Sequence, residues 1–246
     1  MDKEMAWKKE RLGRITASEL GDLFSASGKI IDGNIDYVRH KRFERLRGFS
    51  YPVSSKNFDI GHEQEPYAIE WFRHNYPEFP IVYAMDLPRI PIWVSDFANF
   101  SASPDAFTED ESIVIEVKTV VSNGNAEFYV DELTSYEDKL ASVKEEHGMQ
   151  LAGQFLSNPK VKEIWVLKYI YQRDECDEDV SSPLDPWRGI IFKFKREDFD
   201  LAKVASRIKL FDLFIDSNYE SKALKTLKLH LESETGDLKD AILKED

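Results

Sequence analysis

The pattern of hydrophobic and polar positions predicts helices at both ends of the chain and strands between them. Apolar residues recur at helical spacing over 35–48 and 60–76, and each segment is closed by a glycine or a proline. A shorter helix is expected to end at Phe24, with Thr16 or Ser18 as its N-cap. The first sixty residues are therefore expected to be mainly helical.

From residue 80 the spacing changes to that of short strands rich in Val and Ile. Strands are expected at 81–83, 90–94, 112–121, 162–172 and 188–195. Helices are expected at about 125–133, 137–157, 196–217 and from Tyr219 onward. The acidic, proline-bearing segment 173–187 would form a hairpin loop. Helices before and after a mixed sheet predict one α/β or α+β domain.

Composition narrows the class of protein. The chain has 246 residues, of which 42% are hydrophobic, and this suits one well-packed domain. Its single cysteine, Cys176, excludes an internal disulfide and any four-cysteine metal site. The first ten residues are charged, so no signal peptide is expected, and no apolar run is long enough for a membrane span. We therefore expect a cytoplasmic protein with no membrane partner.

The net charge of −13 argues against a nucleic-acid partner, but the charge is unevenly distributed. Residues 1–60 carry 12 Lys and Arg against 9 Asp and Glu, whereas the remainder carries 21 against 37. A basic N-terminal region would meet phosphates while the outer surface stays acidic. Ordinary solvation of a charged surface explains the same numbers, and charge alone favours that interpretation.

The clearest strand carries the candidate chemistry. Glu116 and Lys118 are two residues apart, so their side chains leave the same face of the strand. If segments 101–107 and 112–118 pair as adjacent strands, Asp105 lies beside that face. Two carboxylates and a strand carbonyl suit Mg²⁺ or Mn²⁺, and the lysine would activate water or stabilise charge on a phosphate. A structural Glu–Lys pair beside a turn is the alternative.

Several segments strengthen the catalytic hypothesis, because together they occur in the same order as the motifs of one protein family. They are Trp7 to Glu19, Gly61-His62-Glu63-Gln64-Glu65, Ser103-Pro104-Asp105, Glu116-Val117-Lys118 and His147-Gly148-Met149-Gln150-Leu151. Together they resemble the motifs of the lambda-exonuclease family, also termed the YqaJ-type viral recombinase family, over residues 7 to about 155.

The resemblance implies a restriction-endonuclease-like core and two-metal hydrolysis of phosphodiesters. It further implies digestion of linear double-stranded DNA from a 5′ end, a ring-shaped homotrimer, and a single-strand annealing protein as partner in phage-type recombination. Under it, residues 1–246 form one nuclease domain. The domain would comprise a basic helical region over 1–58, a catalytic core over 59–195 and C-terminal helices over 196–246.

Matched position by position, the resemblance also implies roles for single residues. The metal ligands would be Asp105, Glu116, the carbonyl of Val117 and Glu65. Lys118 would be the catalytic lysine, Gln150 would hold water or substrate, and Arg11 and Ser18 would bind the 5′ phosphate. A helix N-terminus with a hydroxyl and a guanidinium suits an anion.

Two departures from the family pattern affect the expectations. Ala106 stands where the family usually has glycine, which matters only if that position needs a positive φ. A second phosphate-binding arginine is absent near Ala26 and Ser27, and Lys29 or Arg14 would have to replace it. The 5′-phosphate preference is therefore expected to be reduced.

For some residues near the motifs, the sequence allows both a role in the site and a structural role. Glu63 competes with Glu65 for the metal, and Glu65 is favoured because a helix turns the two in different directions. Gln154 either joins the site or is solvated. His62 and His147 are expected to be hydrogen-bonded structural residues.

The alternatives for the whole protein are a related endonuclease or single-strand nuclease, and a non-catalytic DNA-binding or DNA-mimic protein on the same fold.

Overall fold

The computed structural model describes residues 2–24, 34–50, 56–121, 123–170 and 182–216. Lys29, the expected helix from Tyr219 and most of the expected hairpin loop lie outside the described residues. Among the described helices, none has the length and apolar character needed to span a bilayer.

A mixed five-stranded sheet forms the centre of the fold, in the order β2-β5-β6-β7-β8. Its strands are β2 (Ile81–Tyr83), β5 (Ala106–Thr108), β6 (Ile113–Val120), β7 (Glu163–Ile170) and β8 (Gly189–Lys195). β6 and β7 are parallel along their whole length, and the other neighbours are antiparallel. The expected mixed sheet is thus confirmed.

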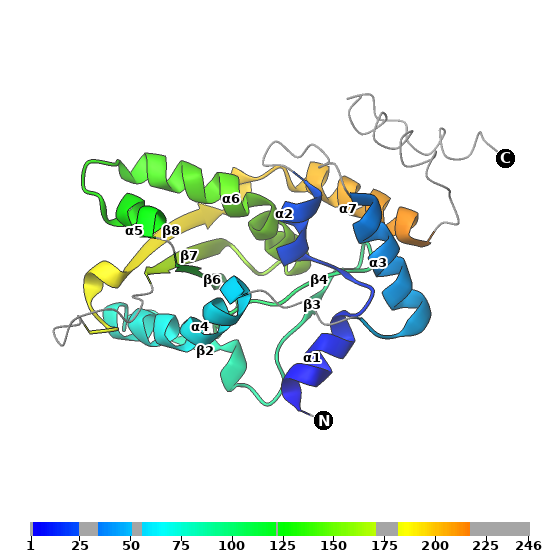
Figure 1. The fold of residues 1–246 in the computed structure, drawn as a ribbon, viewed down its shortest axis with the longest axis horizontal. Helices are drawn as coiled ribbons and strands as arrows, with labels where there is room; N and C mark the ends of the chain where they lie inside the picture. Colours follow the sequence, from blue (N-terminus) through cyan, green and yellow to red (C-terminus); the bar gives the residue numbers. More distant parts are fainter. Residues whose placement is uncertain (1, 25–33, 51–55, 122, 171–181, 217–246) are drawn as a thin grey trace.

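Helices cover both faces of this sheet, as Figure 1 shows. α4 (Lys56–Asn75) packs on the face that carries Ile115 and Val117, whereas α5 (Asn123–Val130) and α6 (Tyr136–Ser157) lie over the opposite face. Successive strand residues point to opposite faces, so β6 and β7 can bury apolar side chains on both sides. The helices remove the apolar surface of each face from water, which stabilises the fold by about 25 cal/mol per Å² of apolar surface buried.

A second layer joins the N-terminal and C-terminal helices. The three-stranded sheet β1-β4-β3 comprises β1 (Ile15–Thr16), β4 (Phe100–Ala102) and β3 (Trp93–Val94). The helices around it are α1 (Lys3–Arg11), α2 (Leu20–Leu23), α3 (Asn34–Arg47) and α7 (Leu201–Asp216). Leu20, Phe100 and Phe211 belong to one apolar core beneath them, and the same core reaches α6.

Short 3-10 turns connect several elements. They are η1 (Ala17–Glu19), η2 (Ala84–Asp86), η3 (Pro186–Arg188) and η4 (Arg196–Asp198). At η1 the Glu19 carboxylate accepts from the backbone N–H of Thr16 at 2.9 Å, so Thr16 is the N-cap.

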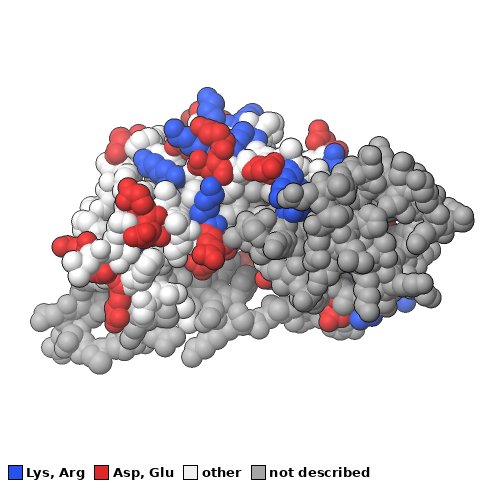
Figure 2. Space-filling view, turned by 90° about the horizontal axis from the view of Figure 1, so that it is seen from above, with Lys and Arg blue, Asp and Glu red and all other residues white. Residues whose placement is uncertain are grey.

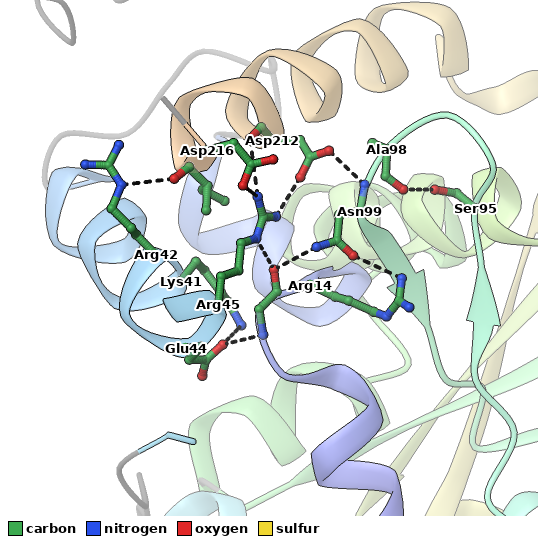
Figure 3. Close-up of polar contacts among 12 residues, drawn as sticks. Arg14, Lys41, Arg42, Glu44, Arg45, Ser95, Ala98, Asn99, Asp212 and Asp216 are labelled. Atoms are coloured by element: carbon green, nitrogen blue, oxygen red, sulfur yellow. Dashed lines mark hydrogen bonds and ion pairs between the residues drawn. The ribbon is translucent and has the colours of Figure 1, made fainter. Parts of the chain in front are cut away.

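A polar network fixes α3 against α7, as Figure 3 shows. The Arg45 guanidinium donates to Asp212 and Asp216 of α7, each at 2.6 Å, and to the carbonyl of Gly13 at 2.7 Å. Asp212 also accepts from the backbone N–H of Asn99 at 2.8 Å. The network therefore ties four separate segments of the chain together.

Three sequence expectations were wrong in detail. The strand expected at 90–94 is reduced to β3, because Pro88 and Pro91 cannot donate to a ladder. The segment 101–107 is not one strand, since β4 and β5 join different sheets with a turn between them. The helix expected from 196 begins at Leu201, after η4.

Candidate active site

The turn between the two sheets places Asp105 beside β6. Ala106 is opposite Ile115 in the β5–β6 register, so the residue before β5 lies next to Glu116 and Val117. The Asp105 Oδ2 atom accepts from the Val117 N–H at 2.7 Å. Asp105 and Glu116 therefore converge as expected, but through a turn rather than through a continuous strand.

Glu116 is the centre of the site and is only 3% exposed. Its Oε1 atom accepts from Lys118 Nζ at 2.8 Å and from Gln150 Nε2 at 2.5 Å. Its Oε2 atom accepts from Gln154 Nε2. The structure thus brings Glu116, Lys118 and Gln150 together.

Gln154 belongs to the same cluster, which decides between its two interpretations. It is 1% exposed, and its Oε1 atom has no hydrogen-bond partner among the described residues. The signal in the sequence was its i,i+4 spacing from Gln150, which places both amides on one face of α6.

Glu65 approaches the site from α4 on the other side of β6. Burial raises its pKa first, and the nearby charge of Glu116 raises it further, while a hydrogen bond to Tyr83 opposes the shift. Glu63 also faces the cavity but is exposed. Burial and proximity to Glu116 therefore favour Glu65 over Glu63.

Several carboxylates lie close together in the site, and they shift the pKa values of the groups around them. Burial raises the pKa of Asp105 well above its usual range, and the charges of Glu116 and Glu65 add to the shift. Burial alone would lower the pKa of Lys118, but Glu116 and Asp105 reverse this and raise it. Lys118 is therefore held as a cation by its acidic neighbours.

A cavity of about 750 Å³ joins this acidic cluster to the N-terminal helices. Arg11 and Ser18 also line this cavity: the Arg11 guanidinium stacks 4.1 Å from the Trp7 ring centroid and donates to the Ser18 hydroxyl at 3.4 Å. The Trp7 indole donates to Ser103 at 2.8 Å, next to the Asp105 turn. One cavity is thus lined both by the carboxylate cluster and by a guanidinium with a hydroxyl.

Arg14 does not share this cavity, although it was a candidate for the phosphate site. Its guanidinium donates to the Asn99 side chain at 3.0 Å and to the Glu10 carbonyl at 3.1 Å, and Figure 3 shows it directed at Asn99. Lys29, the other candidate, lies outside the described residues. Sequence reasoning missed Trp7, which lines the cavity and supports Arg11.

Ala106, His147 and His62 are the remaining residues that the sequence singled out near the site. Ala106 has no positive φ, so alanine is tolerated there without backbone strain. His147 is largely buried and hydrogen-bonded to Lys168, which agrees with a structural role. His62 is exposed at the edge of the cavity.

The donor set fits a hard dication, although the ligands are not yet arranged around one. No group of three or more His, Cys, Asp and Glu side chains in the described part of the chain is spaced to hold a metal as it stands. However, Glu65 and Asp105 have pKa values raised by burial and by mutual repulsion, and carboxylate oxygens are the ligands that Mg²⁺ and Mn²⁺ prefer.

Comparisons with known proteins identify the fold. The sequence matches no protein-family description and no curated protein. Among solved structures, the alkaline exonuclease LHK-Exo from Laribacter hongkongensis matches at a TM-score of 0.63 and 18% identity, covering 92% of this chain and 99% of that one. LHK-Exo in complex with dAMP matches at 0.64 and 20%, with the same coverage.

A third structure is the phage-related exonuclease from Haemophilus somnus 129PT. It matches at a TM-score of 0.60 and 14% identity, covering 87% of this chain and 96% of that one. The chain therefore has the α+β fold of the alkaline and phage-related exonucleases, in agreement with the resemblance of its motifs to those of the lambda-exonuclease family.

Proposed function

We propose that this protein is a Mg²⁺-dependent exodeoxyribonuclease that digests linear double-stranded DNA from 5′ ends. One observation carries the proposal: Asp105, Glu116 and Lys118 meet in a cavity that also contains Glu65. The shared fold with exonucleases supports it, and one of those structures holds dAMP, a deoxynucleotide.

The metal would be held by Glu65, Asp105, Glu116 and the carbonyl of Val117. When bound, Mg²⁺ supplies Lewis-acid polarisation of the phosphate and lowers the pKa of a bound water, and Mn²⁺ can substitute for it. The raised pKa of Asp105 supports this assignment, because a bound cation offsets the burial and the carboxylate repulsion that raise it.

The residues of the chain divide the remaining work. Lys118 keeps its ammonium against Glu116 at 2.8 Å, where it can orient the attacking water and stabilise charge on the phosphate. Gln150 and Gln154 orient the Glu116 carboxylate through one oxygen each. Arg11 and Ser18 bind the 5′ phosphate within the same cavity, since a guanidinium is a strong partner for phosphate.

The assembly and partners of the protein extend the proposal. The family resemblance suggests a homotrimer around the DNA, two-metal hydrolysis, and phage-type recombination with a single-strand annealing protein in a host bacterial cytoplasm. These features rest on the sequence motifs alone.

The decisive experiment is digestion of linear duplex DNA labelled at its 5′ ends, with and without Mg²⁺. We expect label to be released only with Mg²⁺ or Mn²⁺ and not with Ca²⁺, whose looser coordination does not align the reactants. Lys118→Ala should lower turnover at least about a hundredfold while retaining metal and DNA binding. Robust cleavage in excess EDTA would refute the metal requirement.

The substrate form separates the proposal from its alternatives. A covalently closed circular duplex should resist digestion under conditions that consume the linear molecule. Cleavage of the circle would indicate an endonuclease, and preferential cleavage of single strands a single-strand nuclease. Binding without cleavage under all conditions would indicate a non-catalytic DNA-binding protein.

A further inference from the structure

Helix α6 turns one polar stripe toward β6 and β7, formed by Glu146, His147, Gln150 and Gln154. Residues three or four apart share one face of a helix, so these side chains lie in a row. The two glutamines hold Glu116, whereas the first two residues of the stripe meet Lys168 of β7.

Lys168 is a buried lysine that the proposed reaction does not use. It is 4% exposed, and its Nζ atom donates to Glu146 Oε2 at 2.8 Å and lies 2.8 Å from His147 Nε2, which is itself 3.2 Å from Glu146 Oε2. Donation to Nε2 requires the neutral tautomer of His147 with its proton on Nδ1. Burial lowers the pKa of His147, which favours this neutral form.

Lys168 is also the direct neighbour of Lys118. The two residues are Cα partners in the parallel β6–β7 ladder, and both side chains extend toward α6. Two ammonium groups thus lie beside two carboxylates, Glu116 and Glu146. In the structure Lys118 pairs with Glu116 and Lys168 pairs with Glu146, each at 2.8 Å.

Glu146 is the nearest alternative partner that the ladder offers to Lys118, because Lys168, the Cα partner of Lys118, reaches Glu146 at 2.8 Å. Burial lowers the pKa of Lys118, Glu116 and Asp105 raise it, and the charge of Glu146 adds a smaller contribution in the same direction. A flexible ammonium group moves toward the nearest negative charge, and like charges on neighbouring strands repel each other. A cation at position 168 therefore both neutralises Glu146 and repels Lys118 toward Glu116.

We propose that Lys168 is a positioning residue, which occupies Glu146 and thereby keeps the Lys118 ammonium directed at Glu116 and the cavity. The catalytic consequence rests on the proposed nuclease function. The choice of ion-pair partners does not, because it is a property of the folded chain.

The test is a pair of variants assayed for digestion of linear duplex DNA. Lys168→Met keeps the length and apolar stem of the side chain but removes its charge. We expect kcat to fall at least about tenfold with KM little changed, because Glu146 then attracts Lys118 away from Glu116. Adding Glu146→Gln removes the competing carboxylate and should restore kcat to within about threefold of wild type.

A merely structural role for Lys168 predicts a different pattern. The double variant would then be at least as impaired as Lys168→Met, and this result would overturn the proposal, as would wild-type kcat in Lys168→Met. Lys139 provides a matched control, since its buried ammonium binds the carbonyls of Tyr129 and Asp131 at 2.9 and 2.7 Å. Any loss caused by Lys139→Met should not be restored by Glu146→Gln.

Crystal structures of the variants without metal provide a readout that is independent of activity. In Lys168→Met we expect Lys118 Nζ within hydrogen-bond distance of Glu146, and in the double variant we expect it back on Glu116. If Lys118 stays on Glu116 in Lys168→Met, the inference is wrong. If wild type does not digest DNA, the proposed function fails, and these structures still decide the ion-pair exchange.

Discussion

At the residue scale, Asp105 is destabilising when it is ionised without a cation. Folding raises its pKa through burial and through the charges of Glu116 and Glu65. Such a carboxyl stabilises the native state fully below its unfolded pKa, near 3.8, and this stability is lost as the pH rises through the raised native pKa. At neutral or alkaline pH the metal-free protein therefore carries an electrostatic penalty.

Asp105→Asn should remove that penalty while keeping an acceptor for the Val117 N–H. In EDTA at pH 8 we expect the variant to melt about 2–4 °C above wild type, the shift typical of roughly 1 kcal/mol in a chain of this size. The gain should shrink toward pH 4, where the wild-type carboxyl is protonated. Thermal melts across pH measure both effects, and a lower Tm than wild type at pH 8 would contradict the assignment.

Asp110→Asn is the control of opposite sign. The side chain of Asp110 accepts from Thr108 and Ser112, and these hydrogen bonds lower its pKa to about 2. Its stabilisation is present above the unfolded pKa and is lost as the pH falls through the lowered one. The asparagine variant should therefore melt below wild type at pH 8.

Gln154 acts on the same site through Glu116. Gln154→Leu removes the donor to Glu116 Oε2 at a fully buried position. Partners that orient metal ligands typically contribute about 10–100-fold to metal affinity or activity, so we expect at least about tenfold weaker Mg²⁺ or Mn²⁺ binding by calorimetry. Unchanged affinity together with unchanged turnover would show that Gln154 only fills space.

At the scale of elements, the contact between β8 and α4 depends on a missing side chain. A Cβ atom at Gly189 would lie 2.6 Å from the Trp71 ring, which is 2% exposed and tied to the Asp185 carbonyl at 2.7 Å. Gly189→Ala should therefore destabilise the fold by about 1–3 kcal/mol, as overpacking usually does. Denaturant unfolding measures the change.

Gly124→Ala is the matched control for that substitution. Nothing lies within 4 Å of a Cβ at Gly124 in α5, and alanine is the better helix former. We expect it to leave stability unchanged or slightly increased. Equal losses for the two variants would remove the Trp71 contact as the cause.

Helix α1 ends at Arg11, which lines the cavity and is the proposed ligand of the 5′ phosphate. Losing a charge-assisted contact of this kind costs about 1.5–3 kcal/mol, or at least about tenfold in rate. Arg11→Ala should erase most of the preference for 5′-phosphorylated over 5′-hydroxyl ends and leave metal affinity unchanged. Arg14→Ala should keep the preference, since Arg14 is directed at Asn99. Comparing digestion of both end types tests this, and a preference lost only in Arg14→Ala would move the phosphate site.

At the scale of the whole molecule, the basic character of the N-terminal region is partly used within the chain. Lys41 pairs with Glu19 and Glu44 at 2.8 and 3.2 Å, and Arg45 pairs with α7. Figure 2 shows acidic and basic side chains interspersed on the described part of one face, without a field of one sign. The overall charge therefore says less about DNA binding than the cavity does.

The oligomeric state is the property of the whole molecule that can be predicted and measured. The resemblance to the lambda-exonuclease family implies a ring that admits duplex DNA, so we expect a homotrimer. Light scattering at micromolar concentration should give three times the chain mass. A monomer or dimer at that concentration would contradict the ring and leave Arg11 without a channel to guide DNA ends toward it.

The sequence by itself determined most of the elements and which residues meet at the centre of the candidate site. Period-two spacing along 113–120 places Glu116 and Lys118 on one face however the strand is packed, and proline confines strands locally. Asp105 lies beside this strand because a short hairpin joins β5, which begins directly after Asp105, to β6. These features depend on neighbours within a few residues or on one hairpin, which is why reading the chain recovered them.

Only the tertiary structure decided which distant residues complete the site. Gln154 joins it because α6 is rotated to face β6, and Arg14 is turned away from it because Asn99 and α7 lie beside that loop. Such placements depend on how separate elements pack, and one sequence contains many polar residues at the same local spacing. The physical reason is that burial, which gives a polar side chain its partners and shifts its pKa, arises only when the layers come together.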